Sequence, residues 1–195
     1  MMKLSVWLLL MVFSLFSFKN SGWTEEELAM ANTAKDVSYL SPVEKDIFLS
    51  LNLARLYPAK FADIEVERYI PPAKYGDYLK NSPYVKSLLK ELRKMEPLPA
   101  VYADEEMYKE ALCLAKEQAK SGKMGHERKR CQLTYSGECC SYGMDTGRDI
   151  VMQLLIDEKI KSLGHRKICL GNLTKMGTAV GSHPKTGTCA VLDFH

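Results

Sequence analysis

The sequence contains no Cys-x-x-Cys pair and no His-Glu-x-x-His motif, so neither the usual zinc-ribbon pattern nor the usual zinc-protease pattern is present. It has no internal repeat and no low-complexity tract, which argues against a repeat protein or a disordered chain. Lys and Arg outnumber Asp and Glu by only 27 to 24, and so even a balance gives no reason to expect nucleic acid as a partner. With 195 residues, 46% of them hydrophobic, the chain is long enough for one domain with a full core.

An apolar run at residues 6–16 follows a positive charge at Lys3, and small and polar residues come next. This order is typical of a secretory signal peptide, predicted as residues 1–22 with cleavage between about Ser17 and Gly22. The run is well short of the roughly 20 apolar residues needed to cross a bilayer, so no stable membrane span is expected. We therefore expect an exported protein, secreted or periplasmic.

Six cysteines in an exported chain predict at least one disulfide, because exported thiols rarely stay free in number. The sequence does not choose among the many possible pairings. Adjacent cysteines are not expected to bridge each other, because a disulfide needs Cα atoms about 5.5 Å apart with an unstrained dihedral angle. The six are Cys113, Cys131, Cys139, Cys140, Cys169 and Cys189.

The stretch 41–44, Ser-Pro-Val-Glu, is a capping box with proline at the first helical position, and it predicts the start of a helix. Apolar residues recur at helical spacing until Pro58. Asn52 and Arg55 lie one turn apart on this helix, where they could hold polar groups. The polar residues 23–40 are interpreted as an N-terminal lead segment before the folded domain.

Further helices are predicted where apolar residues recur three and four positions apart, and a hairpin where two short apolar runs flank a turn. The predicted helices lie within 83–96, 104–121 and 148–158, and the strands are 175–183 and 187–194. No regular element is expected between Gly122 and Gly147, where the basic stretch 126–130 is interpreted as a solvated loop. Helices first, strands last and no βαβ alternation predict an α+β fold with an antiparallel sheet.

Two Gly-His pairs each have a carboxylate nearby in the sequence, which places His126, Glu138, Asp157 and His165 in loops or at helix ends. Two imidazoles and two carboxylates can bind a transition metal, and neutral imidazole favours zinc or copper. They can equally form two pairs in which each acid orients its ring and raises its basicity. The spacing alone does not decide between a site and four scattered residues.

From residue 41 to residue 194 the sequence resembles the CAP superfamily (SCP domain), the secreted cysteine-rich secretory, antigen-5 and pathogenesis-related type proteins. The matching pieces are LNLARLYPAKFA, GHE, GECCSYG, LLIDEKIKSLGHRKI, and MGTAVG with CAVLDF, in the family's order. The compact piece LLIDEKIKSLGHRKI is similar to that of the short bacterial or fungal branch, which lacks the extra cysteine-rich modules of the animal proteins. The resemblance implies one CAP domain at 41–195, folded as a three-layer α-β-α sandwich with an antiparallel central sheet.

The resemblance also implies a shallow cleft lined by a His/acid tetrad. By motif, the two histidines are His126 and His165, and the Gly-Glu carboxylate is Glu138. The second acid is Asp157, with Glu158 as its rival. Two departures from the family pattern concern the hydrogen bonding and metal geometry: Cys139 replaces a frequent asparagine, and an aspartate stands at 157 where many members have glutamate.

The resemblance implies a secreted binding or interaction protein, with zinc or another divalent metal held by His126 and His165. Its partner would be an extracellular lipid, glycan or protein. The alternative is a metal-assisted extracellular hydrolase in which Glu138 activates water. A third possibility makes the tetrad a hydrogen-bonded brace across the loops. His183, alone in the hairpin turn, is expected to face solvent.

Overall fold

The computed structural model describes residues 22–132 and 134–195, and the predicted signal peptide lies outside them except for Gly22. Helices make up the N-terminal part of the described chain, strands and helices mix after Tyr102, and four strands form one sheet. The helices are α1 (Glu25–Ala31), α2 (Pro42–Leu56), α3 (Pro58–Phe61), α4 (Pro83–Leu92), α5 (Glu105–Ser121), α6 (Gly147–Ile156) and α7 (Gly164–Cys169), with a π turn at Ala62–Val66 and a 3₁₀ turn at Ala73–Tyr75. The strands are β1 (Tyr102–Ala103), β2 (Gly137–Tyr142), β3 (Lys175–His183) and β4 (Gly187–Phe194).

The sheet has the order β1-β3-β4-β2, which places β2 at one edge. The predicted hairpin is confirmed, because β3 and β4 pair antiparallel over the expected residues. β2 adds antiparallel to β4, whereas the short β1 runs parallel to β3, so the sheet is mixed and mostly antiparallel. The prediction of no regular element between Gly122 and Gly147 was wrong at β2. Five of the six β2 residues are buried, and a strand covered on both faces shows no alternating pattern.

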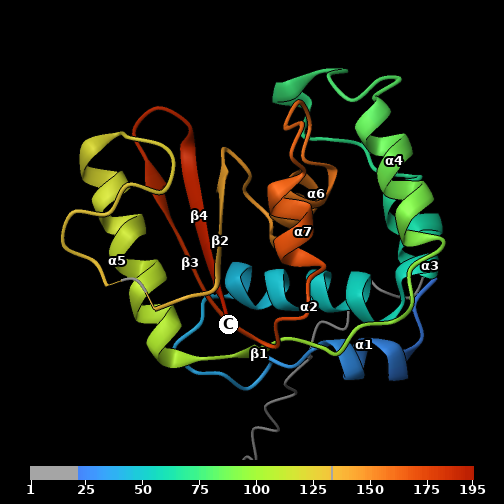
Figure 1. Ribbon diagram of the computed structural model, residues 1–195, viewed down its shortest axis with the longest axis horizontal. Helices are drawn as coiled ribbons and strands as arrows, with labels where there is room; N and C mark the ends of the chain where they lie inside the picture. Colours follow the sequence, from blue (N-terminus) through green and yellow to red (C-terminus); the bar gives the residue numbers. More distant parts are fainter. Residues whose placement is uncertain (1–21, 133) are drawn as a thin grey trace, which may run out of the picture.

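Helices cover both faces of the sheet, which confirms the α+β class (Figure 1). α5 lies against one face of β3 and β4, while α6 and α7 lie on the opposite side beside β2. α5 approaches β3 closely because β3 carries glycine at the contact. A Cβ on Gly177 would lie 2.1 Å from backbone atoms of Met107 and Tyr108, so any side chain there would push the layers apart.

The predicted capping box of α2 is present, with the Ser41 and Glu44 side chains each accepting from the other residue's backbone N–H. Arg55 is fully buried near the end of this helix, and it donates hydrogen bonds to four backbone carbonyls. These belong to Pro99, Cys169, Gly171 and Leu173. Arg55 therefore fastens α2 to the segment that leads from α7 into β3.

Residues 23–40, expected as a lead segment, pack into the same core as the rest of the chain. Trp23, Ala31, Ala34 and Leu40 are buried there, and α1 rests on α2. Asn52 ties this segment down, because its amide donates to the carbonyl oxygens of Ala31 and Val101. Across the described residues, no helix is long and apolar enough to cross a bilayer.

Candidate functional site

The Asp157–His165 pair is built within the turn that joins α6 to α7. Asp157 caps the C-terminus of α6 in a left-handed conformation, with φ 56°. Its Oδ1 lies 2.8 Å from Nδ1 of His165, and its Oδ2 accepts the backbone N–H of His165 at 3.0 Å. One buried carboxylate thus fixes both the ring and the start of α7. Glu158 points elsewhere and bonds the Ser82 hydroxyl, so Asp157 is the acid beside the histidine.

Arg166 anchors the short helix α7 that carries His165. Its guanidinium is buried and donates to the carbonyls of Leu155 and Ile156 at the end of α6, at 2.6 and 2.9 Å. It also reaches the Tyr84 carbonyl on α4 at 3.1 Å. Six residues are too few for a helix to be stable alone, so these bonds set where His165 stands.

The His126–Glu138 pair joins the loop after α5 to the edge strand β2. The loop turns at Gly122 and Gly125, whose φ angles of 63° and 103° suit glycine. His126 Nδ1 lies 2.6 Å from Oε1 of Glu138. The Glu138 side chain is 2% exposed whereas that of His126 is 54% exposed, so the acid is a buried support for a ring at the surface.

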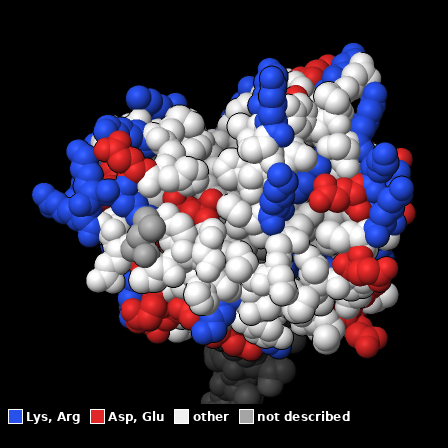
Figure 2. All heavy atoms as spheres, in the orientation of Figure 1, with Lys and Arg blue, Asp and Glu red and all other residues white. Residues whose placement is uncertain are grey.

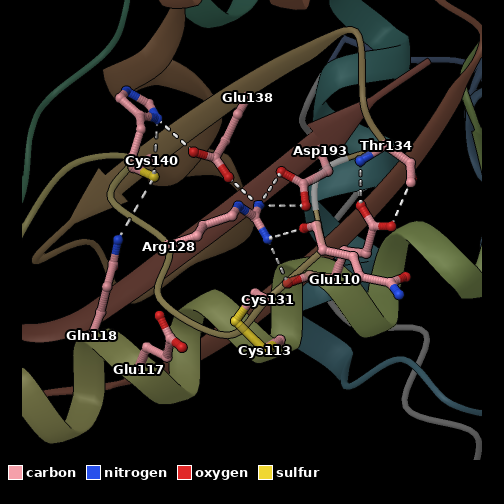
Figure 3. Close-up of polar contacts among 12 residues, drawn as sticks. Glu110, Cys113, Glu117, Gln118, Arg128, Cys131, Thr134, Glu138, Cys140 and Asp193 are labelled. Atoms are coloured by element: carbon pink, nitrogen blue, oxygen red, sulfur yellow. Dashed lines mark hydrogen bonds and ion pairs between the residues drawn. A yellow bond between two sulfur atoms is a disulfide. The ribbon is translucent and has the colours of Figure 1, made fainter.

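Arg128 lies behind Glu138 and corrects the prediction that stretch 126–130 is a solvated loop. Its side chain is only 3% exposed and lies between two carboxylates (Figure 3). The guanidinium bonds Oε2 of Glu138 and both oxygens of Asp193, the latter at 3.0 and 2.8 Å. Glu138 and Asp193 face each other across β2 and β4. The sequence analysis missed Arg128 and Asp193, and a lone aspartate inside the apolar β4 pattern was the available signal.

This buried network sets the charge of the first pair. Burial opposes ionisation of Glu138, but hydrogen bonds from His126 and Arg128 outweigh it, so the pKa of Glu138 lies below its usual value. Burial raises the pKa of Asp193, and the nearby Glu138 carboxylate raises it further against the opposing effect of Arg128. The hydrogen bond to Glu138 raises the pKa of His126 above 6.5. One guanidinium therefore supports one ionised carboxylate, Glu138, and a second that holds its proton more readily.

The two histidine–carboxylate pairs lie next to each other at the edge strand β2, with their imidazole rings close together. The ring centres of His126 and His165 are 6.4 Å apart, and the planes are inclined by 35°. Each ring turns Nδ1 toward its own acid, at 2.6 Å for Glu138 and 2.8 Å for Asp157. Nε2 of each ring is then the nitrogen left for a ligand, and carboxylates in this position orient metal-binding histidines in proteins. The structure thus brings together all four residues named from the sequence.

A largely apolar cleft of about 440 Å³ opens beside His165 and Asp157. Figure 2 shows this side of the molecule hollowed between the α5 half and the α6–α7 half, with mostly neutral walls. Three large side chains on its rim, Tyr78, Met124 and Ile160, are 37%, 54% and 41% exposed. Pockets of this size hold small ligands or single side chains of a larger partner.

The remaining histidines and cysteines are not part of the tetrad, although the Cys140 sulfur contacts the His126 ring. His183 is 2% exposed, so the expectation of a solvent-facing residue was wrong; Tyr142 covers it and Thr186 bonds its Nδ1 at 2.9 Å. Cys139, at the asparagine position, is buried with its sulfur 4.0 Å from that of Cys169. The predicted disulfide is confirmed as Cys113–Cys131, which fastens the His126 loop to α5.

The α+β fold and the two histidine–carboxylate pairs at the sheet edge agree with the resemblance of the sequence to the CAP superfamily. The model of the Cysteine-rich secretory protein family, CAP, matches residues 86–194, and the chain belongs to this family. No curated protein matches the sequence. The family match covers every residue of the tetrad, together with Arg128 and Asp193.

Proposed function

We propose that this chain is an exported CAP-family binding protein that holds a divalent metal ion, zinc in the first place, between His126 and His165. The observation that carries the proposal is the pairing of each Nδ1 with a buried carboxylate, which leaves two Nε2 atoms for one ion. Zinc–nitrogen bonds are about 2.0–2.1 Å, so rings whose centres are 6.4 Å apart need only a small side-chain movement to share one tetrahedral ion. Bound there, the ion would supply a positive charge and an open position for an oxygen of the partner.

Export is supported by the signal-like residues 1–22 and by the Cys113–Cys131 disulfide, since disulfides persist in oxidising compartments. The partner is an extracellular lipid, glycan or protein whose apolar part enters the cleft beside His165. The aromatic and aliphatic rim suits such a group, and the metal would hold a polar end next to it.

Binding explains the geometry better than hydrolysis. A hydrolase of this type needs Glu138 free to take a proton from a water molecule. Both oxygens of Glu138 are engaged, Oε1 by His126 and Oε2 by Arg128. A carboxylate held in this way orients an imidazole, and its bond to the Arg128 guanidinium makes it a weaker base toward water.

Calorimetric titration of the disulfide-bonded protein with zinc tests the proposal. We expect His126→Ala and His165→Ala each to weaken zinc binding at least tenfold, and Asp157→Asn to weaken it about 10–100-fold. The control is His195→Ala, because His195 is exposed just after β4 and its ring contacts Ser136 and neither acid of the tetrad. Equal zinc affinity in the wild type and the double histidine variant would overturn the proposal. Zinc-dependent peptide or ester cleavage that both histidine variants lose would favour the hydrolase instead.

A further inference from the structure

Cys140 presents a thiol to the His126–Glu138 pair. Alternate residues of a strand point to the same face, so Cys140 follows Glu138 on the α5 side of β2. Its sulfur lies 3.8 Å from Nδ1 of His126 and 3.6 Å from the Gly125 carbonyl oxygen. Cys140 also lines the cleft, so an ion in solvent has a route to this sulfur.

Three different donors converge at this point. One ligand atom each from His126, Glu138 and Cys140 lies within 4.8 Å of the other two. Around a tetrahedral ion, with bonds of about 2.0–2.1 Å to nitrogen or oxygen and about 2.3 Å to sulfur, such atoms stand roughly 3.3–3.6 Å apart. Small side-chain shifts suffice to place all three on one ion. The Glu138 oxygen concerned faces His126, while the other remains on Arg128.

Gln118 supplies a second, independent observation. Its side chain on α5 is buried, and its Nε2 contacts the Cys140 sulfur at 3.9 Å and the Gly125 carbonyl at 2.7 Å (Figure 3). Its Oε1 is buried and has no hydrogen-bond partner among the described residues. Buried amide oxygens in proteins are nearly always bonded. The amide of Gln118 therefore lies against the sulfur with its oxygen unused, and a water that enters with an ion would satisfy this oxygen.

We propose that Cys140, His126 and Glu138 form a second metal site, selective for soft ions that prefer a thiolate, such as Cd²⁺ or Cu⁺. Binding breaks the S–H bond, releases its proton to solvent and forms a metal–sulfur bond. The site goes beyond the proposed function, because it uses Nδ1 of His126 and does not need His165. The two sites exclude each other, since Nδ1 cannot bind a metal while it donates to Glu138.

The other cluster of metal-ligand groups among the described residues does not compete. Cys113, Glu117 and Cys131 also lie close together. Both of these sulfurs are in the disulfide, so neither is a thiolate available to an ion.

Titration of the disulfide-bonded protein with Cd²⁺, followed by the ultraviolet sulfur-to-cadmium charge-transfer band, tests the second site. We expect one equivalent to produce the band. Cys140→Ser should abolish it and weaken cadmium binding at least tenfold. The matched control is Cys189→Ser, another buried free cysteine, on β4, which should keep the band. Cadmium NMR of the wild type reports sulfur ligation without any variant, so a misfolded Cys140→Ser protein does not compromise the test.

His165→Ala separates the two proposals. We expect this variant to lose zinc binding and to keep the cadmium–sulfur band. Absence of the band in the wild type, or an undiminished band in Cys140→Ser, overturns the second site and leaves the proposed function intact. Loss of the band in His165→Ala also overturns it, because the sulfur-bound ion would then need His165, which the second site does not use. A normal band combined with zinc binding that ignores His165 supports the second site and overturns the proposed function.

Discussion

The two histidine–acid pairs look alike in chemistry but are built in opposite ways. Asp157 and His165 are eight residues apart, and the Asp157 carboxylate accepts hydrogen bonds from the uncharged backbone N–H groups of His165 and Arg166. Glu138 and His126 come from a strand and a loop, and their support is a buried ion network that reaches Asp193. The first pair is a local turn; the second depends on charge and on long-range register.

We therefore expect the Asp157–His165 pair to keep its geometry and the His126–Glu138 pair to change its partners more easily. The His165 side chain is 24% exposed and that of His126 is 54% exposed. Within residues 22–132 and 134–195, His126 is the only histidine with a thiol next to its Nδ1. A change of ion should therefore act first on the His126 half, whose ring is the more exposed and has a thiol beside it.

Removal of the buried Arg128 guanidinium should have the largest effect on stability, because it takes away the ionic support that distinguishes the His126 pair from the His165 pair. Arg128→Met leaves Glu138 and Asp193 buried without their shared cation, and we expect the free energy of unfolding to fall by about 3–5 kcal/mol. The loss should shrink in acid, where protonated carboxylates no longer repel. Urea denaturation measures both effects. Arg93→Met is the control, since its exposed pairs with Asp63 and Glu67 are screened by solvent and should contribute little to stability. Equal losses in the two variants would contradict a buried network.

Loss of the Cys113–Cys131 disulfide should have the second largest effect on stability. This disulfide holds the His126 loop, whereas no disulfide among the described residues holds the His165 half. Cys113 and Cys131 are 18 residues apart, and the double serine variant should lose about 3 kcal/mol of unfolding free energy. Hydrogen exchange should show that backbone amides of the loop 122–131 lose protection while those of His165 and Arg166 keep it. Equal loss of protection in both halves would mean that the two pairs do not fold as separate units.

Proton binding by His126 should have the smallest effect on stability, and it tests the His126–Glu138 hydrogen bond directly. In metal-free protein, NMR titration should place the pKa of His126 above 6.5, because Glu138 accepts its Nδ1–H, and Glu138→Gln should lower it. A folded pKa above the unfolded value means that the pair stabilises the fold fully below about 6.5 and loses this contribution as pH rises through the raised pKa. A wild-type His126 that titrates below 6.5 would contradict the role of Glu138.

What the sequence predicted well depends on contacts close together in the chain. The capping box of α2 and the β3–β4 hairpin are such features, and both lie where the local pattern placed them. The acid beside His165 stayed open because Asp157 and Glu158 are neighbours. The left-handed conformation at Asp157 decides between them, since it turns this carboxylate toward α7.

The parts that escaped prediction come from strand register. Arg128 is buried only because β2 and β4 pair so that Glu138 faces Asp193, which is 55 positions later in the chain. No local pattern in a basic loop signals such a partner. β2 itself was missed because both of its faces are covered, which leaves a strand of this kind without the alternation that reveals one.

The position of β4 gives the two halves an order in time during synthesis. β4 is the last strand of the described chain, yet it lies inside the sheet and is the strand on which β2 pairs. Chains fold from the N-terminus as they are made, and β2 has nothing to pair with until β4 has left the ribosome. The hydrogen bonds of the Asp157–His165 turn are local and need neither β2 nor β4. The histidine that comes first in the sequence is therefore the last to receive its support.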